Sequence, residues 1–387
     1  MKSRDNIVIL GCNGGTDIAY GGGAYVTTAM AKCLSENGFN VHLISTIGLN
    51  VDELSRVHGW SLNNNVYSHY IFKYGKDTRI PYIIALQLVS RFKKLINELD
   101  PVLVIYNDDY PLSIDQELSR LKVPRILYAH FPYTTRHVLG LDFMYKTTEW
   151  SLVETVINYV GVNRVLGDLR RIDYIMTNSE GTKNIISMVH DIKNATILRP
   201  PITSAMHQNI HKVRPVFLHA ARQDKTFLHG DFTNFVRIIS KELPSSFFII
   251  NRNKYVDVSR LGVSNKVVVT RWLSNDLWRR VLSMTKYYLH FKWFEGFGIA
   301  TAEAIMMGAI PIVYRSLFNG SWTDIARLCD RDCGFSSVDE AVEHIKDLES
   351  DETKFNSIHE HLVNEISRVT NYEYFCRSLI SIINKFV

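Results

Sequence analysis

Short apolar segments alternate with amphipathic segments along this chain, and the alternation runs twice. In the first half, strands are predicted at residues 7–10, 41–45, 102–106, 125–129 and 174–178, with helices at 24–37 and 83–99. In the second half, strands are predicted at residues 216–219, 247–251, 267–270, 287–291 and 310–314, with helices at 234–241 and 275–285. Buried strands separated by helices are typical of parallel sheets that are covered on both faces. The sequence therefore predicts the α/β class, with two doubly wound, Rossmann-like domains.

A polar, Pro-rich segment separates the two halves. It begins at Arg199-Pro200-Pro201 and stays polar as far as Pro215, which is typical of an interdomain linker. With 387 residues, the chain is long enough to form two hydrophobic cores. We expect residues 1–200 to form the first domain, residues 201–370 the second, and residues 371–387 a terminal helix. Two such domains that face each other would form a central cleft at the carboxyl ends of their strands, where ligands bind in this architecture.

Two glutamates flank a glycine-rich turn between the predicted strands 287–291 and 310–314. Glu295 stands in the turn, and Glu303 lies about one helical turn inside the helix that follows. Backbone N–H groups at a helix start favour an anion, whereas carboxylates repel it unless they accept hydrogen bonds from hydroxyl groups. A nucleoside-diphosphate sugar meets both conditions. The residues expected around this donor are Glu295, Gly296, Phe297, Gly298, Ile299, Ala300 and Glu303.

The spacing of Glu295 and Glu303, the flanking glycines and the helix-then-strand context resemble the Glu-(seven residues)-Glu signature of retaining family-four glycosyltransferases, which have the GT-B fold. The resemblance implies transfer of a hexose, mannose or glucose, from a GDP- or UDP-linked sugar to an acceptor hydroxyl, with retention at the anomeric carbon. It implies no metal, and no cofactor besides the donor itself. Glu295 would orient the sugar hydroxyls and Glu303 the ribose. The predicted helix at 372–386 would cross back to the first domain.

The same resemblance assigns site residues in other segments. Gly22 and Gly23, at the start of the predicted helix 24–37, match a glycine loop of the first domain. Arg222, after the strand 216–219, matches an arginine that holds the diphosphate and acts in catalysis. Lys225 is assigned as the second phosphate contact. It comes earlier than the family pattern has it, so His229 stays as the alternative.

A histidine follows the predicted strand 125–129. His130 matches a cleft histidine that the family places close to the transferred sugar, and is assigned to catalysis with Glu295 and Arg222. The run Ala129–Tyr133, together with Gly320–Ile325, is similar to mannosyltransferases that extend lipid-linked oligosaccharides. We therefore expect the acceptor to be a glycan or a lipid-linked glycan.

Neither the acidic residues nor the cysteines predict a metal site. Asp108 and Asp109 end the predicted strand 102–106, and metal-dependent transferases use an aspartate pair of different spacing. The run Asp330-Arg331-Asp332 lies in a late polar loop. The five cysteines have no metal-binding spacing, and Cys329 and Cys333 are placed as a packed pair on one helix face. We expect reduced cysteines and a cytoplasmic setting.

Charge and hydropathy limit the partners. The formal net charge of +5 is spread over both halves, which argues against a nucleic-acid interface. No apolar run is long enough for a membrane helix, and the first residues lack a signal-peptide pattern. The basic segment 79–99 and the aromatic segment 143–162 motivate the hypothesis of peripheral membrane contact, although core helices have the same pattern. The alternative functions are a GT-B nucleotide-sugar epimerase, a disaccharide phosphorylase and a non-catalytic sugar-nucleotide binding subunit.

Overall fold

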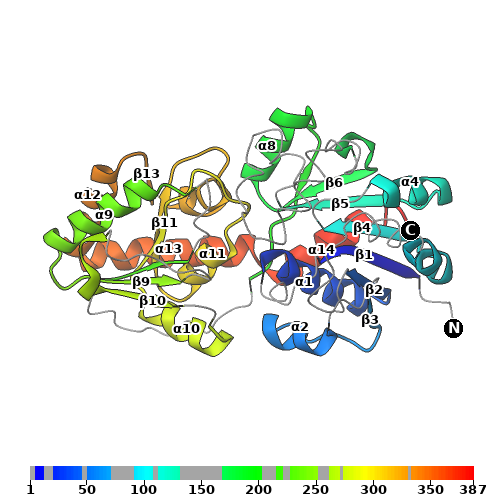
Figure 1. Cartoon of the computed structure of the whole chain (residues 1–387), viewed down its shortest axis with the longest axis horizontal. Coiled ribbons are helices and arrows are strands. Elements are labelled where there is room, and N and C mark those ends of the chain that lie inside the picture. The colour runs from blue at the N-terminus through cyan, green and yellow to red at the C-terminus, as the bar shows by residue number, and fades with distance from the viewer. Residues whose placement is uncertain are drawn as a thin grey trace. The chain divides into compact units, whose positions relative to one another are not determined.

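The chain forms two compact units (Figure 1). The computed structural model describes residues 5–12, 21–45, 50–70, 91–107, 112–130, 168–202, 215–220, 227–251, 261–270, 273–329 and 333–387. Unit 1 consists of Met1–Asn178, Ile185–Pro201 and Tyr372–Val387, and unit 2 of Ser179–Asn184 and Ile202–Asn371. The predicted division into domains at residues 200 and 370 stays a prediction.

Unit 1 contains a seven-stranded parallel sheet in the order β3-β2-β1-β4-β5-β6-β7. Its strands are β1 (Asn6–Cys12), β2 (Asn40–Ser45), β3 (Val66–Tyr70), β4 (Leu103–Asn107), β5 (Arg125–Ala129), β6 (Tyr174–Thr177) and β7 (Thr196–Ile197). Its helices are α1 (Gly22–Glu36), α2 (Val51–His58), residues 91–99, α4 (Leu112–Leu121), the short η3 (Leu169–Arg171), α14 (Tyr372–Ile383) and most of α8 (Glu180–His190). The strand order reverses at β1, which pairs with β2 on one side and β4 on the other. The carboxyl ends of β1 and β4 therefore form a topological switch point, where ligands bind in doubly wound sheets.

Apolar side chains fill the space between this sheet and its helices. Every residue of β4 is buried, because a central parallel strand is covered on both faces. Val104 of β4 and Leu127 of β5 belong to a cluster with Phe92 and Ile96 of the helix at 91–99. Helix α1 packs against β1 and β2, with α2 and α14 beside it. This packing fixes the start of α1 close to the switch point.

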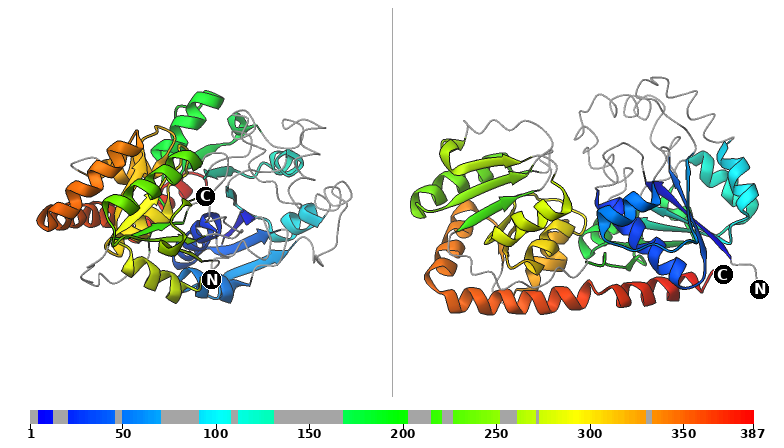
Figure 2. Two further views of the ribbon diagram at one scale, coloured as in Figure 1. Left: turned by 60° about the vertical axis from the view of Figure 1, so that its left-hand side comes forward. Right: turned by 90° about the horizontal axis from the view of Figure 1, so that it is seen from below.

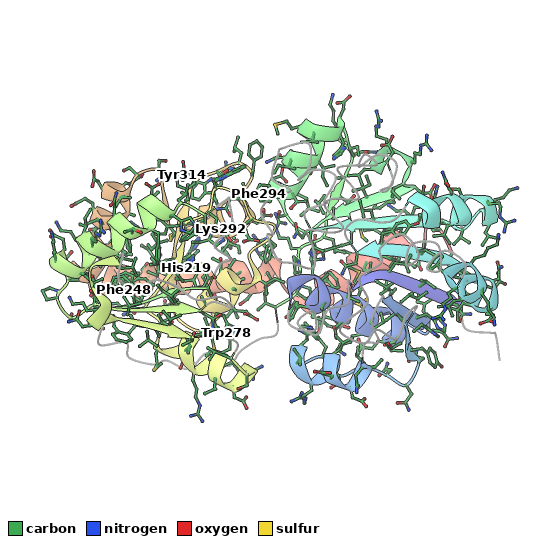
Figure 3. All side chains as sticks on the ribbon, in the orientation of Figure 1. His219, Phe248, Trp278, Lys292, Phe294 and Tyr314 are labelled. Atoms are coloured by element: carbon green, nitrogen blue, oxygen red, sulfur yellow. A yellow bond between two sulfur atoms is a disulfide. The ribbon has the colours of Figure 1, made fainter. Side chains whose placement is uncertain are left out.

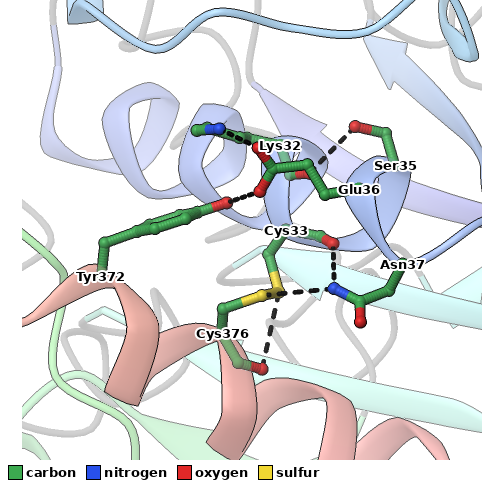
Figure 4. The surroundings of a disulfide bond; sticks show 7 residues. All are labelled: Lys32, Cys33, Ser35, Glu36, Asn37, Tyr372 and Cys376. Carbon is green, nitrogen blue, oxygen red and sulfur yellow. Dashed lines mark hydrogen bonds and ion pairs between the residues drawn. A yellow bond between two sulfur atoms is a disulfide. The ribbon is translucent and has the colours of Figure 1, made fainter.

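A disulfide joins the C-terminal helix to α1 within unit 1 (Figure 4). It links Cys33 of α1 to Cys376 of α14, and next to it the Tyr372 hydroxyl donates a 2.6 Å hydrogen bond to Glu36. A second disulfide joins Cys329 to Cys333. The expectation of reduced cysteines is therefore wrong for these four residues. The contact between α1 and α14 brings together residues that are 343 positions apart, and no local spacing encodes it.

Unit 2 contains a six-stranded parallel sheet in the order β10-β9-β8-β11-β12-β13. Its strands are β8 (Val216–His219), β9 (Phe247–Asn251), β10 (Val267–Thr270), β11 (Tyr287–His290), β12 (Ile310–Tyr314) and β13 (Gly334–Phe335). Its helices are α9 (His229–Glu242), α10 (Asn275–Met284), α11 (Ile299–Met306), α12 (Val338–Ser350) and α13 (Glu352–Val369), with the short turns η5 (Ser264–Lys266), η6 (Ser321–Ile325) and η7 (Ala326–Leu328). The order reverses at β8, so the carboxyl ends of β8 and β11 form the second switch point.

Alternate residues of the strands of unit 2 point to opposite faces and bury two layers of apolar side chains. Phe217 and Tyr287 belong to a large cluster with residues of α9, α12 and α13, whereas Leu218 and Tyr288 pack with residues of α10 and α11. Helices accordingly cover both faces of the sheet (Figure 2). The two doubly covered parallel sheets confirm the predicted α/β class.

Predicted and observed elements agree best in the strands. Five predicted strands coincide with β5, β8, β9, β10 and β12. Helices α2, α4, α8, α12 and α13 and strand β3 were not predicted. Helix α9 begins at His229, five residues before its predicted start at Asn234, so His229 is helical. The part of the predicted helix 83–99 before residue 91 lies outside the described residues.

Candidate active site

Two glycines shape the turn that joins β11 to α11. Gly298 precedes α11 with a φ of 85°, and a Cβ atom there would lie 1.9 Å from Ser321 Oγ. A Cβ atom on Gly320, in the neighbouring loop, would lie 1.6 Å from the carbonyl oxygen of Gly296. No side chain fits at either distance, so both positions need glycine for the turn to close.

The loop that contains Gly320 holds this turn in place. The N–H of Gly320 donates to the carbonyl oxygen of Glu295 at 3.1 Å, and Asn319 Nδ2 donates to that of Lys292 at 2.8 Å. Ser321 Oγ lies 3.1 Å from Thr301 Oγ1 on α11. This loop is the run Gly320–Ile325 that carried the similarity to mannosyltransferases. In the structure this run supports the backbone of the turn that contains Glu295 and Gly298, which we call the glutamate turn.

Three groups surround the carboxylate of Glu295. Its Oε2 lies 3.4 Å from both Lys292 Nζ and His290 Nε2, and its Oε1 accepts from the N–H of Gly296 at 3.1 Å. Burial acts to raise the pKa of Glu295, but the Lys292 ammonium and the His290 hydrogen bond outweigh it and hold that pKa well below its ordinary value. Lys292, which Figure 3 labels, is only 6% exposed. Glu295 is therefore a fixed, ionised hydrogen-bond acceptor.

The second glutamate has different surroundings. Glu303 lies on α11, and its Oε2 accepts a 3.0 Å hydrogen bond from the indole N–H of Trp278, which is labelled in Figure 3. Burial raises the pKa of Glu303, although the Trp278 hydrogen bond and the charge of Arg279 oppose this rise. The pKa values of Glu295 and Glu303 are thus shifted in opposite directions. Such divergence between neighbouring carboxyl groups is typical of functional sites.

The start of α11 can receive an anion. Gly298 has no side chain to cap the first N–H groups, and Ile299 and Ala300 are partly exposed. Helix N-termini carry partial positive charge and favour negatively charged ligands. The structure places Gly296, Gly298, Ile299 and Ala300 with Glu295 at this helix start, whereas Phe297 is buried in the core of unit 2 and Glu303 lies on the second turn of α11. The described residues contain no group of three His, Cys, Asp or Glu side chains that could hold a metal ion.

A second cluster forms at the switch point of unit 1. His130, directly after β5, has its Nε2 2.6 Å from Oδ1 of Asn107, the last residue of β4. Asn107 Nδ2 donates in turn to the carbonyl oxygen of Gly23 at 2.9 Å and lies 2.5 Å from Thr27 Oγ1. The predicted residues His130 and Gly23 are therefore close together, with Asn107 between them.

Several predicted site residues lie outside the described residues: Arg222, Lys225, Asp108, Asp109, the run 131–133 and the run 330–332. His229, the alternative to Lys225, is the first residue of α9, and its ring meets Phe227 edge-on with 4.6 Å between centroids. The choice between Lys225 and His229 stays a prediction.

Sequence reasoning missed four residues that contact the turn or its two glutamates: His290, Lys292, Asn319 and Trp278. His290 and Lys292 stand at the exit of a predicted buried strand, and a charged or titratable side chain in that place is a readable signal. Asn319 gave no signal, because only the folded loop carries its side chain to the carbonyl group of Lys292. In the sequence, Trp278 cannot be told apart from any other apolar residue of a predicted helix.

Comparison with known proteins finds similarity in the first part of the chain. Residues 20–203 match the family model named Glycosyltransferase Family 4. A relative from Candida albicans, GDP-Man:Man(3)GlcNAc(2)-PP-Dol alpha-1,2-mannosyltransferase, is 24% identical over 264 residues, which cover 57% of this chain and 43% of that protein. The match thus spans less than half the length of this relative.

Solved structures show the fold of the whole chain. Sucrose-phosphate synthase from Thermosynechococcus elongatus superposes with a TM-score of 0.71 and 12% identity over 99% of both chains. HepE of Anabaena, in complex with UDP and glucose, gives the same score and identity over 99% of this chain and 100% of its own. WaaG, a glycosyltransferase involved in lipopolysaccharide biosynthesis, gives 0.68 and 11% over 96% and 98%. The predicted GT-B fold is confirmed, and residues 20–203 are similar to the Glycosyltransferase Family 4 model.

Proposed function

We propose that this chain is a retaining, metal-independent hexosyltransferase. It transfers mannose or glucose from a GDP- or UDP-linked sugar to a hydroxyl group of a glycan or a lipid-linked glycan. The observation that carries the proposal is the glutamate turn of unit 2. There an ionised Glu295, held by Lys292 and His290, lies beside a helix start that can receive an anion.

The comparisons support the donor class. HepE was solved with UDP and glucose, and the name of the Candida relative specifies a GDP-mannose donor and a pyrophosphate-linked glycan acceptor. The similarity of the run at Gly320–Ile325 to mannosyltransferases favours mannose. Because this run supports the backbone of the turn, it links the subfamily resemblance to the donor site.

The proposed reaction exchanges one C–O bond for another. The bond between the anomeric carbon and the diphosphate breaks, a bond to the acceptor oxygen forms on the same face, and the acceptor proton passes to a diphosphate oxygen. Negative charge develops on the diphosphate, so fixed cations and N–H dipoles aimed at it lower the barrier. The N–H groups of Ile299 and Ala300, with Arg222 and Lys225, take this role. This set of charges supplies what a divalent cation supplies in other transferases.

The remaining residues orient the two substrates. Ionised Glu295 accepts hydrogen bonds from sugar hydroxyls, and these bonds strengthen as the sugar approaches the transition state. Glu303 accepts from the ribose, with its Oε2 oriented by Trp278. In unit 1, the backbone at Gly22 and Gly23 receives the donor, and His130 contacts the transferred sugar.

The experiment is a donor panel. Purified full-length protein is incubated with GDP-mannose, GDP-glucose, UDP-glucose and UDP-galactose, with and without a lipid-linked glycan acceptor, and release of nucleoside diphosphate is measured. We expect acceptor-dependent release from one of the mannose or glucose donors, unchanged by EDTA, and an α-linked product by NMR. Epimer formation or phosphorolysis would replace the proposal with one of the alternative enzymes. Binding without release would indicate a non-catalytic subunit.

The cytoplasmic location and the peripheral membrane contact are further parts of the proposal. No helix among the described residues is both long and apolar enough to cross a membrane. Co-sedimentation with anionic vesicles at low salt tests the contact directly. Protein that stays in the supernatant at every lipid concentration would rule it out.

A further inference from the structure

An open groove of about 740 Å³ lies in unit 1, beside the amino ends of β2 and β3. Its volume is within the range of about 300–1,000 Å³ that small-molecule sites occupy. The carboxyl ends of β1 and β4 are at the opposite edge of this parallel sheet, so the groove is separate from the switch point. The end of α1, the turn after it, the loop before β3 and β3 itself line the groove with Ser35, Glu36, Gly38, Leu62, Asn63, Asn64, Asn65 and Tyr67.

The amide of Asn65 has an unused acceptor in this groove. Asn65 is only 6% exposed, and its Nδ2 donates to the carbonyl oxygens of Ser35 at 3.1 Å and Phe39 at 2.5 Å. These two bonds use both hydrogens of the amide nitrogen and fix the orientation of the group. No donor among the described residues meets its Oδ1, so a hydroxyl group in the groove can donate to that oxygen.

A tyrosine ring forms part of the groove wall. Tyr67, the second residue of β3, is 42% exposed. One of its faces stacks on the ring of His42, with 5.0 Å between centroids and 19° between planes, which holds the tyrosine ring in one orientation. The faces of aromatic rings carry partial negative charge and attract the C–H groups of a sugar ring. The exposed Tyr67 ring therefore suits the apolar face of a pyranose.

Two exposed asparagines add neutral hydrogen-bonding groups. Asn63 and Asn64 precede Asn65 in the loop before β3, and neither side chain has a hydrogen-bond partner among the residues that the structure describes. Each amide offers both donor and acceptor atoms, which match the neighbouring hydroxyl groups of a sugar.

The charges around the groove disfavour an anionic ligand. Glu36, labelled with Ser35 in Figure 4, is the one charged side chain among the lining residues. Its carboxylate accepts a 2.6 Å hydrogen bond from the Tyr372 hydroxyl and pairs with Lys32. Because no lining residue is basic, a phosphate or a carboxylate would find no cation there. A neutral ligand rich in hydroxyl groups fits the groove best.

We propose that this groove is a non-catalytic binding site for a neutral oligosaccharide. One sugar ring stacks on Tyr67, and the hydroxyl groups around it exchange hydrogen bonds with the three asparagines. The inference goes beyond the proposed function, because the groove is at the edge of the sheet opposite the switch point and its ligand binds without donor or transfer.

The test is a binding titration with defined sugars. Full-length protein is titrated, without donor, with mannopentaose and with maltopentaose, and binding is followed by saturation-transfer NMR. We expect a dissociation constant of about 1 mM for at least one of them, because an open groove buries little of its ligand. Tyr67→Ala should bind the same pentasaccharide at least about tenfold more weakly, because the stacking is lost. Tyr67→Phe keeps the ring and should bind within about twofold of the wild-type protein.

A second variant leaves the tyrosine in place. Asn63→Ala combined with Asn64→Ala removes two amides from an exposed loop and should weaken binding about tenfold. Asn356→Ala, at an exposed position of α13 in unit 2, is the matched control and should bind as the wild-type protein does. Pentagalacturonate, which carries a carboxylate on each sugar, is the anionic probe and should bind far more weakly than the neutral sugars. Thermal unfolding followed by circular dichroism checks that each variant is folded.

Three results would overturn the proposal. The first is that neither neutral pentasaccharide binds at concentrations up to about 10 mM. The second is an affinity that Tyr67→Ala and the double asparagine variant leave unchanged, and the third is pentagalacturonate binding as tight as that of the neutral sugars. If no donor releases nucleoside diphosphate but pentasaccharide binding still depends on Tyr67, the proposed function fails and this binding site stands.

Discussion

Gly298 and Gly320 of unit 2 are under a different constraint from Gly23 of unit 1. A Cβ atom on Gly298 or Gly320 of unit 2 would lie 1.9 or 1.6 Å from a neighbouring oxygen. A Cβ atom on Gly23 of unit 1 would meet Asn107 Nδ2 at 3.7 Å and His130 Nε2 at 3.8 Å, which is ordinary van der Waals contact. The fold alone explains Gly298 and Gly320, but it leaves room for a side chain at Gly23. Packing within the described residues therefore does not require glycine at position 23.

The largest effect is expected where the fold needs glycine. Gly320→Ala places a methyl group on the Gly296 carbonyl, so the turn must open, and we expect a loss of about 4 kcal/mol or more in the free energy of unfolding. Urea unfolding followed by circular dichroism measures it. Gly230→Ala is the control in the same unit, because nothing lies within 4 Å of its Cβ position on α9. It should gain up to about 1 kcal/mol. Equal free energies of unfolding for Gly320→Ala and Gly230→Ala would show that the fold does not need glycine at position 320.

The next largest effect concerns catalysis at the glutamate turn. Glu295→Gln keeps the size of the side chain but removes the charge that Lys292 and His290 hold. We expect kcat to fall by about a hundredfold, with donor affinity nearly retained, because the lost bonds strengthen in the transition state. Steady-state release of nucleoside diphosphate measures this change. Glu343→Gln, at an exposed position of α12, controls for the loss of a charge. Unchanged turnover in folded Glu295→Gln would remove Glu295 from the mechanism.

A smaller effect is expected for the glycine of unit 1, Gly23. Gly23→Ala lies in the first turn of α1 with space for its methyl group, so it should stabilise the protein by up to about 1 kcal/mol. If Gly23 lets the donor approach the backbone, the same variant should bind the nucleotide-sugar about tenfold more weakly, a loss of about 1.4 kcal/mol. Calorimetric titration and urea unfolding of one preparation give both values. Unaltered donor affinity would show that Gly23 serves neither the fold nor the ligand.

The smallest expected effect is a difference between the two units in how stability depends on pH. In unit 1, burial and the neighbouring His69, 2.9 Å away, lower the pKa of His42 to about 4. Because an unfolded histidine titrates near pH 6.5, the unfolded state binds more protons between these values, and stability falls as the pH falls. The pKa of Glu295 in unit 2 is also lowered, but from the range of a carboxyl group, so its contribution to stability is present above the pKa of an unfolded glutamate and is lost only in more acidic solution.

We therefore expect the wild-type protein to lose about 1 kcal/mol through His42 between about pH 7.5 and 5.5, and His42→Gln to lose correspondingly less. Urea midpoints at the two pH values measure the difference. The wild-type protein in the same two buffers is the reference. If the stability of His42→Gln depends on pH as strongly as that of the wild-type protein, the buried histidine pair does not account for the acid sensitivity.

The sequence predicted local elements better than the contacts between them. Strands such as β8 and β12 were found because a short apolar run bounded by polar residues or glycine is a local property. Glu295 and Glu303 were singled out because a glycine-rich turn between two apolar segments and the spacing of two glutamates around it are local properties. The hydrogen bond from Asn319 to Lys292 and the disulfide from Cys33 to Cys376 depend on segments that only folding brings together. The opposite pKa shifts of the two glutamates depend on burial and on neighbours, and the spacing of residues carries neither.

The central claim is that the start of α11 in unit 2 binds the diphosphate of the donor. Calorimetric titration of GDP and UDP into Ala300→Asp and Ala300→Asn tests it most directly. The two side chains are nearly the same size, and both are accepted near a helix start, where an aspartate even favours the helix. The account predicts that the nucleoside diphosphate binds Ala300→Asp at least about tenfold more weakly than Ala300→Asn, because only the carboxylate repels it. Equal affinity of the two variants would contradict the account.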